Sequence, residues 1–136
     1  RGDNMDEKNL IRKALDAREK AYVPYSNFRV GAAILMENGE VYTGCNIEIA
    51  SYSPTICAER TAIFKAISEG KRKIKAIAVV GDSDYTYPCG VCRQVIREFG
   101  KDAIIIVANS EKDYKKYRLN ELLPYSFGPE DLKENE

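Results

Sequence analysis

The sequence contains no histidine, has no net charge and lacks any long apolar run. Without histidine, a metal site in this chain has to be built from cysteine and carboxylate ligands. Lys and Arg number 21, as do Asp and Glu, so the chain lacks the positive charge with which most nucleic-acid-binding proteins neutralise phosphates. This balance favours a small-molecule substrate and no nucleic-acid partner.

The chain also lacks the features of membrane and secreted proteins. No apolar stretch approaches the roughly 18–20 residues of a membrane-spanning helix, and no charged-then-apolar leader opens the sequence. We therefore expect a cytoplasmic protein without a membrane partner. Residues 1–4 precede Met5 and are interpreted as a remnant of cloning. Residues 5–136 are then expected to form a single domain, since this length suffices for one hydrophobic core and not for two.

Four cysteines are the candidate metal ligands: Cys45, Cys57, Cys89 and Cys92. Two disulfides are an alternative, but cytosolic thiols stay reduced, so metal binding is favoured. Cys89 and Cys92 are i, i+3 neighbours at an expected helix start and point the same way. Cys57 begins another expected helix. The positive end of a helix favours thiolate over thiol, so these positions suit metal ligands.

Three cysteines suit a tetrahedral zinc ion whose fourth position is left for water. A closed structural site with Cys45 as fourth ligand is an alternative, although Cys45 on a strand fits better as a small buried hydrophobe. Glu59 favours a catalytic site, because it does not share the direction of Cys57 and can act as general base toward that water. Arg60 and Arg93 are candidates to donate hydrogen bonds to sulfur, with a solvent-facing position as a near-equal alternative for Arg93.

The pattern of apolar residues and turn signals predicts alternating helices and strands. Helices are expected over residues 6–21, 57–68 and 89–99, with shorter helical pieces over 120–123 and 130–134. Strands are expected over residues 28–36, 41–45, 74–81, 103–108 and 114–119. The first two strands form a hairpin through Asn38–Gly39. This order predicts an α/β fold, a three-layer α/β/α sandwich around a mixed sheet.

The spacing of Cys57-Ala-Glu and Pro88-Cys-x-x-Cys matches the signature of zinc nucleobase deaminases. Beyond it, five blocks in the same order resemble the small cytidine deaminases of pyrimidine salvage. These blocks are residues 24–33 (PYSNFRVGAA), 44–48 (GCNIE), 57–62 (CAERTA), 88–94 (PCGVCRQ) and 122–132 (LLPYSFGPEDL). They span nearly the whole chain and are far more specific than a lone Cys-x-x-Cys.

The resemblance implies one zinc deaminase domain of cytidine deaminase-like fold. It further implies a homotetramer that hydrolyses cytidine and 2′-deoxycytidine to uridine and 2′-deoxyuridine plus ammonia. Zinc would be bound by Cys57, Cys89 and Cys92, and Glu59 would shuttle protons. The resemblance also implies a set of substrate contacts: Asn46 and Glu48 at the sugar hydroxyl, Phe28 on the pyrimidine, the Ala58 backbone at the base, and Ala50, Tyr52 and Phe127 from a neighbouring subunit.

The sequence is also compatible with other interpretations. Taken without the resemblance, Asn46 and Glu48 are equally turn residues, and Phe28 on a strand face fits the core. Ile49 stands where the family commonly has Asn, and Pro54–Ile56 differ from the commonest approach to the first cysteine, which leaves the substrate range open. Rival functions are deamination of a cytosine nucleoside antibiotic such as blasticidin S, editing of RNA or DNA, and a non-catalytic zinc-stabilised interaction domain.

Overall fold

The computed structural model describes residues 5–132 of the chain. The interpretation of residues 1–4 as a remnant of cloning, and the end of the helical piece expected over 130–134, lie outside these residues. Within them, no helix combines the length and the apolar character needed to cross a bilayer.

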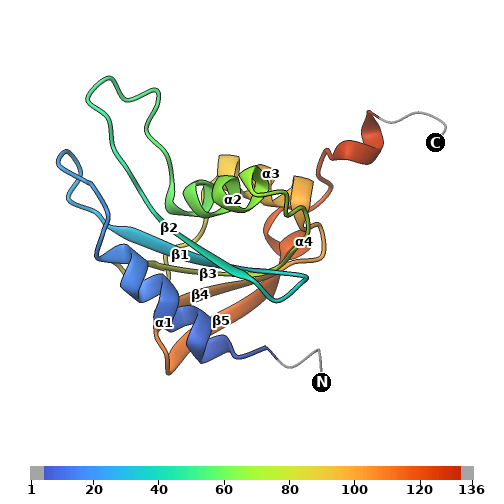
Figure 1. Ribbon diagram of the computed structural model, residues 1–136, viewed down its shortest axis with the longest axis horizontal. Helices are drawn as coiled ribbons and strands as arrows, with labels where there is room; N and C mark the ends of the chain where they lie inside the picture. The colour runs from blue at the N-terminus through green and yellow to red at the C-terminus, as the bar shows by residue number, and fades with distance from the viewer. Residues whose placement is uncertain (1–4, 133–136) are drawn as a thin grey trace.

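Five strands form one mixed sheet in the order β2-β1-β3-β4-β5 (Figure 1). Three of its four strand pairs are antiparallel: β1 (Val30–Met36) with β2 (Val41–Cys45), β1 with β3 (Ile74–Gly81), and β4 (Ile104–Ser110) with β5 (Asp113–Arg118). β3 and β4 are parallel. A parallel pair needs a crossover between its strands, and here the crossover contains a helix, α3 (Gly90–Phe99).

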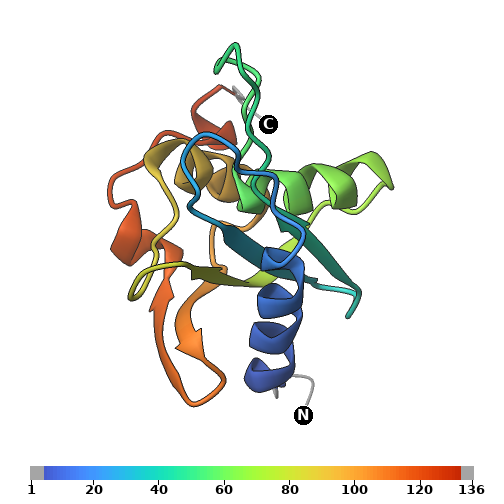
Figure 2. The same cartoon turned by 90° about the vertical axis from the view of Figure 1, so that its left-hand side faces the viewer.

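Helices cover both faces of the sheet, as Figures 1 and 2 show. α1 (Glu7–Arg18) lies on one face, and α2 (Ala58–Ser68) and α3 lie on the other. Side chains alternate along β3: Ala78 packs in the core beneath α1, and Ile77 in the core beneath α2 and α3. The predicted three-layer α/β/α sandwich is confirmed. A short helix, α4 (Leu119–Leu122), and a 3-10 turn (Pro129–Asp131) complete the described chain.

The first residues of the helices position the candidate metal ligands. Asp6 caps α1, its side chain accepting a hydrogen bond of 3.0 Å from the Asn9 amide. α2 and α3 have Cys57 and Cys89 at the capping position, in extended backbone conformation and without a capping hydrogen bond from the side chain. Both sulfur atoms therefore remain available at the positive ends of two helices.

Several expected boundaries are wrong by one to three residues; the strand expected over 103–108, for example, is Ile104–Ser110. The first helix ends at Arg18 and not near Ala21. The first strand begins at Val30, so that Phe28 precedes it. The amides of Phe28 and Arg29 donate to side chains, those of Ser26 and Asp82. The β1–β3 ladder begins where Val30 pairs with Gly81, the last residue of β3, which leaves Phe28 and Arg29 outside it.

Candidate metal centre and active site

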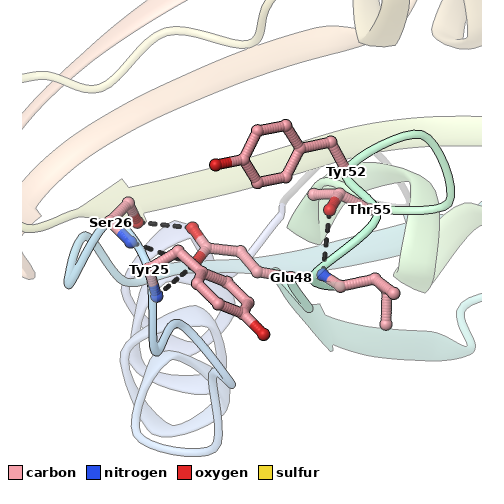
Figure 3. Close-up of a pocket in the computed structure, with 6 residues that line it drawn as sticks. Tyr25, Ser26, Glu48, Tyr52 and Thr55 are labelled. Atoms are coloured by element: carbon pink, nitrogen blue, oxygen red, sulfur yellow. Dashed lines mark hydrogen bonds between the residues drawn. The ribbon is translucent and has the colours of Figure 1, made fainter.

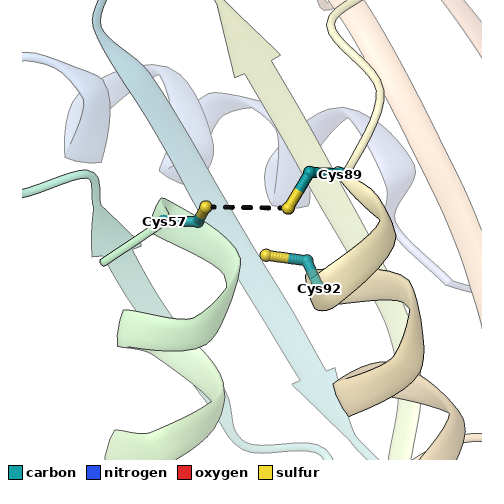
Figure 4. Close-up of side chains that lie close together, drawn as sticks. All are labelled: Cys57, Cys89 and Cys92. Carbon is teal, nitrogen blue, oxygen red and sulfur yellow. Dashed lines mark hydrogen bonds between the residues drawn. The ribbon is translucent and has the colours of Figure 1, made fainter. Parts of the chain in front are cut away.

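The thiols of Cys57, Cys89 and Cys92 come together where α2 and α3 begin (Figure 4). Their three sulfur atoms lie within 4.8 Å of one another, and those of Cys57 and Cys89 are 3.8 Å apart. Two sulfurs bound tetrahedrally to zinc at about 2.3 Å would be separated by about 3.8 Å. The donor set and its spacing therefore fit a zinc ion.

The pKa shifts of these thiols also favour a cation bound among them. Contact with Cys92 lowers the pKa of Cys57, and a hydrogen bond of 3.2 Å from Arg60 to the Cys57 sulfur adds to this effect. The same contact, together with burial, raises the pKa of Cys92. Neighbouring thiolates repel one another, so they do not all ionise unaided. A divalent cation among the three sulfurs would remove this repulsion.

Glu59 lies beside this cluster in the first turn of α2 and is only 3% exposed. Burial raises the pKa of its carboxyl to about 7, because a charged carboxylate is poorly solvated there. A carboxyl with a pKa near neutrality can both accept and release a proton. Glu59 is therefore a candidate general acid–base group beside the three cysteines that could hold a metal.

The fourth cysteine takes no part in the cluster. Cys45 ends β2, lies outside the group of three sulfurs and, like the other three cysteines, is free. Neither two disulfides nor a closed four-cysteine site is therefore found. Burial raises the pKa of its thiol, as expected for a small apolar side chain against the core.

The two candidate arginines differ in their contacts. Arg60 bonds to sulfur as expected. Arg93 instead donates to two main-chain carbonyl oxygens, that of Pro88 at 2.7 Å and that of Leu122 at 2.8 Å. It thus holds the turn that leads into Cys89 and ties that turn to the end of α4, a role that neither expectation for Arg93 included.

Glu48 faces a pocket of about 410 Å³ between two loops (Figure 3). Its carboxylate accepts hydrogen bonds of 3.1 Å from the amides of Tyr25 and Ser26, and another from the Ser26 hydroxyl. These bonds, the Ser26 hydroxyl first, lower the pKa of Glu48. The remaining pocket residues are Ile49, Tyr52 and Thr55. Ser26 was not identified from the sequence, although the turn-forming composition of residues 24–27 is a signal for it.

Two backbone hydrogen bonds lie between the segment that carries Glu48 and the segment that leads into Cys57. Ile47 and Ile56 each donate to the other's carbonyl oxygen at 3.0 Å. The next residue after Ile56 is Cys57, and the next after Ile47 is Glu48. The Ile47–Ile56 pair thus closes the base of the loop. Glu48 lies just inside the loop and Cys57 just outside it, on neighbouring backbone segments.

Asn46 is bound to the segment that carries Phe28. Its side-chain oxygen accepts from the Val30 amide, and its side-chain nitrogen donates to the Phe28 carbonyl oxygen, each at 2.9 Å. Ala58, whose backbone is expected to meet the base, is the first residue of α2 and is buried. The structure therefore brings Asn46 and Phe28 together, and Ala58 lies between Cys57 and Glu59.

The remaining expected contacts lie on two exposed segments. Ala50 is exposed, Tyr52 is 73% exposed, and Phe127 is 57% exposed. The loop with Ala50 and Tyr52 and the C-terminal segment with Phe127 project on opposite sides of the molecule (Figure 1). Tyr52 lines the pocket of Glu48, whereas Ala50 and Phe127 are not among the residues that line it.

The fold and the three-cysteine centre are typical of a zinc-dependent enzyme with an α/β/α sandwich. Comparison with known proteins identifies the family. Residues 4–108 match the family model described as the cytidine and deoxycytidylate deaminase zinc-binding region, a span that includes all three clustered cysteines. The chain belongs to this cytidine deaminase family.

Relatives agree over nearly the full length. A cytidine deaminase from Sporosarcina psychrophila is 52% identical over 130 residues, 94% of this chain and 96% of that protein. One from Halalkalibacterium halodurans is also 52% identical, over 96% of this chain and 100% of that protein. The crystal structure of cytidine deaminase from Burkholderia pseudomallei, at 48% identity, superposes with a TM-score of 0.83 over 88% of this chain and 97% of that chain.

Proposed function

We propose that this protein hydrolyses cytidine and 2′-deoxycytidine to uridine and 2′-deoxyuridine, releasing ammonia. The observation that carries the proposal is the burial of Glu59 directly beside an open three-cysteine site. The relatives at 52% identity, named as cytidine deaminases, support the choice of substrate. The reaction belongs to pyrimidine salvage, and we place it in the cytoplasm.

The metal would be held by Cys57, Cys89 and Cys92. Zinc bound there would supply Lewis acidity, which makes a water molecule nucleophilic at neutral pH. Arg60 donates to the Cys57 sulfur and so offsets part of the negative charge of three thiolates. This hydrogen bond keeps the site more electrophilic than the sulfur ligands alone would leave it.

Glu59 would move the protons. Its carboxylate takes a proton from the attacking water and delivers it to the ring nitrogen next to the amino-bearing carbon. That carbon thereby becomes a better electrophile and gains the hydroxyl. Glu59 then takes the remaining proton from the added hydroxyl and delivers it to the amino group. The carbon–nitrogen bond breaks as the hydroxyl oxygen forms the carbonyl of the product, and ammonia leaves. The pKa of about 7 for this buried carboxyl suits a group that has to accept and release protons in one cycle.

The substrate contacts follow from the pocket and its loops. Asn46 and Glu48 would hold the sugar hydroxyl, Phe28 would pack on the pyrimidine, and the Ala58 backbone would meet the base. Glu48 already accepts bonds from Tyr25 and Ser26. A carboxylate has about four acceptor sites, which leaves capacity for a hydroxyl.

We further propose a homotetramer in which neighbouring subunits complete each site. The exposure of Tyr52 and Phe127, on segments that project from opposite sides of one chain, supports this arrangement, because exposed aromatic side chains are typical of interfaces. Ala50, Tyr52 and Phe127 would then contact the nucleoside of a neighbouring subunit. Sedimentation of the zinc-loaded protein tests it; a monomer with full activity would contradict it.

The test of the activity is loss of the cytidine absorbance band with zinc-quantified protein, run beside Glu59→Gln. We expect turnover by the native chain and a rate lower by at least about 10²-fold in the variant, with zinc content unchanged. Substantial turnover by Glu59→Gln would contradict the role of Glu59. Inactivity of the zinc-loaded native chain would contradict the proposal and direct the assay to cytosine nucleoside antibiotics or to a structural metal.

A further inference from the structure

The peptide group between Phe28 and Arg29 is held at both ends by side chains. Its carbonyl oxygen accepts a hydrogen bond of 2.9 Å from the side-chain nitrogen of Asn46. Its amide donates one of 2.7 Å to an Asp82 carboxylate oxygen. Because a peptide group is planar and rigid, two bonds at opposite ends fix its orientation.

The peptide group on the other side of Phe28 is tied as well. The Phe28 amide donates to the Ser26 hydroxyl at 3.0 Å. Asn27, between them, has a φ of 59°, a left-handed conformation that asparagine adopts more readily than most residues other than glycine. Phe28 thus lies in irregular backbone whose direction is set by surrounding side chains, and these include Asp82.

Asp82 is itself firmly placed. It directly follows β3 and accepts two further hydrogen bonds from the Arg29 guanidinium, at 3.1 and 3.0 Å. Arg18 of α1 lies 3.9 Å from the same carboxylate and donates to the carbonyl oxygen of Gly81 at 2.6 Å. The hydrogen bonds from Arg29 are the main cause of the lowered pKa of Asp82. The carboxylate therefore connects the Phe28 segment to the central sheet and to α1.

We propose that Asp82 is a positioning residue for the substrate, acting through its hydrogen bond to the Arg29 amide, which fixes the direction of the Phe28 ring. The proposal rests on the proposed function, in which that ring packs on the pyrimidine. For this role, Asp82 has to supply an oxygen atom that accepts the hydrogen bond from the Arg29 amide. Its ion pair with the Arg29 side chain is secondary, because removal of the guanidinium leaves the bond from the Arg29 amide in place.

The experiment separates these two bonds. Asp82→Ala removes both, Asp82→Asn keeps an oxygen for the amide but no charge, and Arg29→Gln removes the ion pair but keeps the amide. We expect Asp82→Ala to raise the KM for cytidine about fivefold to tenfold, the factor associated with one lost hydrogen bond. Its kcat and zinc content should change less than about twofold. Asp82→Asn and Arg29→Gln should both keep KM within about twofold of native.

A double-mutant cycle with Phe28→Ala tests the route of the effect. In the Phe28→Ala background, Asp82→Ala should raise KM less than about twofold further, because the ring that it positions is gone. Should Asp82→Ala fail to fold, Asp82→Glu displaces the oxygens by one methylene, keeps the charge, and should raise KM likewise.

Three results would overturn the inference while leaving the proposed function intact: an unchanged KM in Asp82→Ala, an equal rise in Arg29→Gln, or a full additional rise in the Phe28→Ala background. Absence of turnover by the zinc-loaded native protein would overturn the proposed function and this inference with it.

Discussion

The backbone of α2 lies directly against Gly44 of β2. A Cβ atom at Gly44 would be 2.6 Å from the carbonyl oxygen of Ala58 and 2.6 Å from the amide nitrogen of Ala62. Backbone atoms cannot give way as the end of a flexible side chain can. The absence of a side chain at Gly44 therefore determines how closely the start of α2, with Cys57 and Glu59, approaches the sheet.

We expect Gly44→Ala to destabilise the protein by about 1–3 kcal/mol, the usual cost of adding a methyl group to a tightly packed contact. Because α2 has to shift, zinc affinity should fall as well. Thermal unfolding and competition with a zinc chelator measure the two effects. Gly90→Ala is the control, since a Cβ there meets nothing within 4 Å and alanine favours helix. Equal effects of the two substitutions would contradict the explanation.

Arg60 should matter for the metal and not only for the fold. Arg60→Gln loses the hydrogen bond to the Cys57 sulfur, and we expect zinc affinity or kcat to fall about 10-fold to 100-fold. Arg12→Gln is the matched control, because Arg12 forms an exposed pair with Glu111, and such pairs contribute about 0–1 kcal/mol. If both variants bind zinc as the native chain does, Arg60 does not tune the site.

Substitution of Cys45 and substitution of Cys89 should have different effects on zinc binding. Cys45→Ser should retain one zinc per chain, because Cys45 lies outside the group of three sulfurs. Cys89→Ser should bind zinc at least about 10-fold more weakly. Chelation of zinc from the native protein should lower its melting temperature, since a ligand that binds only the folded state stabilises it. Loss of zinc from Cys45→Ser would instead indicate a closed four-cysteine site.

Glu7 should make stability depend on pH. Hydrogen bonds from Lys116 and from Tyr114 lower the pKa of Glu7 below its ordinary value of 4.5. Its folded pKa is depressed, so its contribution to the free energy of unfolding is fully present above about pH 4.5 and is lost as the pH falls through the folded pKa. The stability difference between native protein and Glu7→Gln should therefore be larger at pH 7 than at low pH.

Urea unfolding over the range from pH 7 down to about pH 3 measures this difference. Lys116→Met removes the first cause of the shift, so Glu7→Gln in that background should show a smaller change with pH. A difference between native protein and Glu7→Gln that stays constant across the range would contradict the prediction.

Much of the fold was predictable because its signals are local. The strands over 41–45 and 74–81 and the α/β/α layering agree with the structure. β-Branched runs, glycine turns and helical periodicity act over a few residues, so they can be read from the sequence. The start of β1 at Val30 could not be predicted, because it depends on pairing with Gly81, a partner distant in the sequence.

The candidate site, like the fold, was predictable from the sequence only in part. Motif spacing pointed to Cys57, Cys89, Cys92 and Glu59, and the structure places the three sulfurs together with the carboxyl buried beside them. The contacts of Arg93 with two carbonyl oxygens differ from expectation. A long arginine side chain reaches many neighbours, and which of them it meets depends on the packing of segments far apart in the chain.

By itself, the sequence determined which residue types are available and where helices begin: without histidine, three cysteines and one glutamate at two helix starts were the only strong pattern for a catalytic metal. Only the tertiary structure decided the 3.8 Å between the Cys57 and Cys89 sulfurs, the exclusion of Cys45, and the connection of Asp82 to Phe28 through the Arg29 amide. The physical reason is that helix starts depend on neighbouring residues, whereas these distances arise when separate helices and strands pack on one sheet.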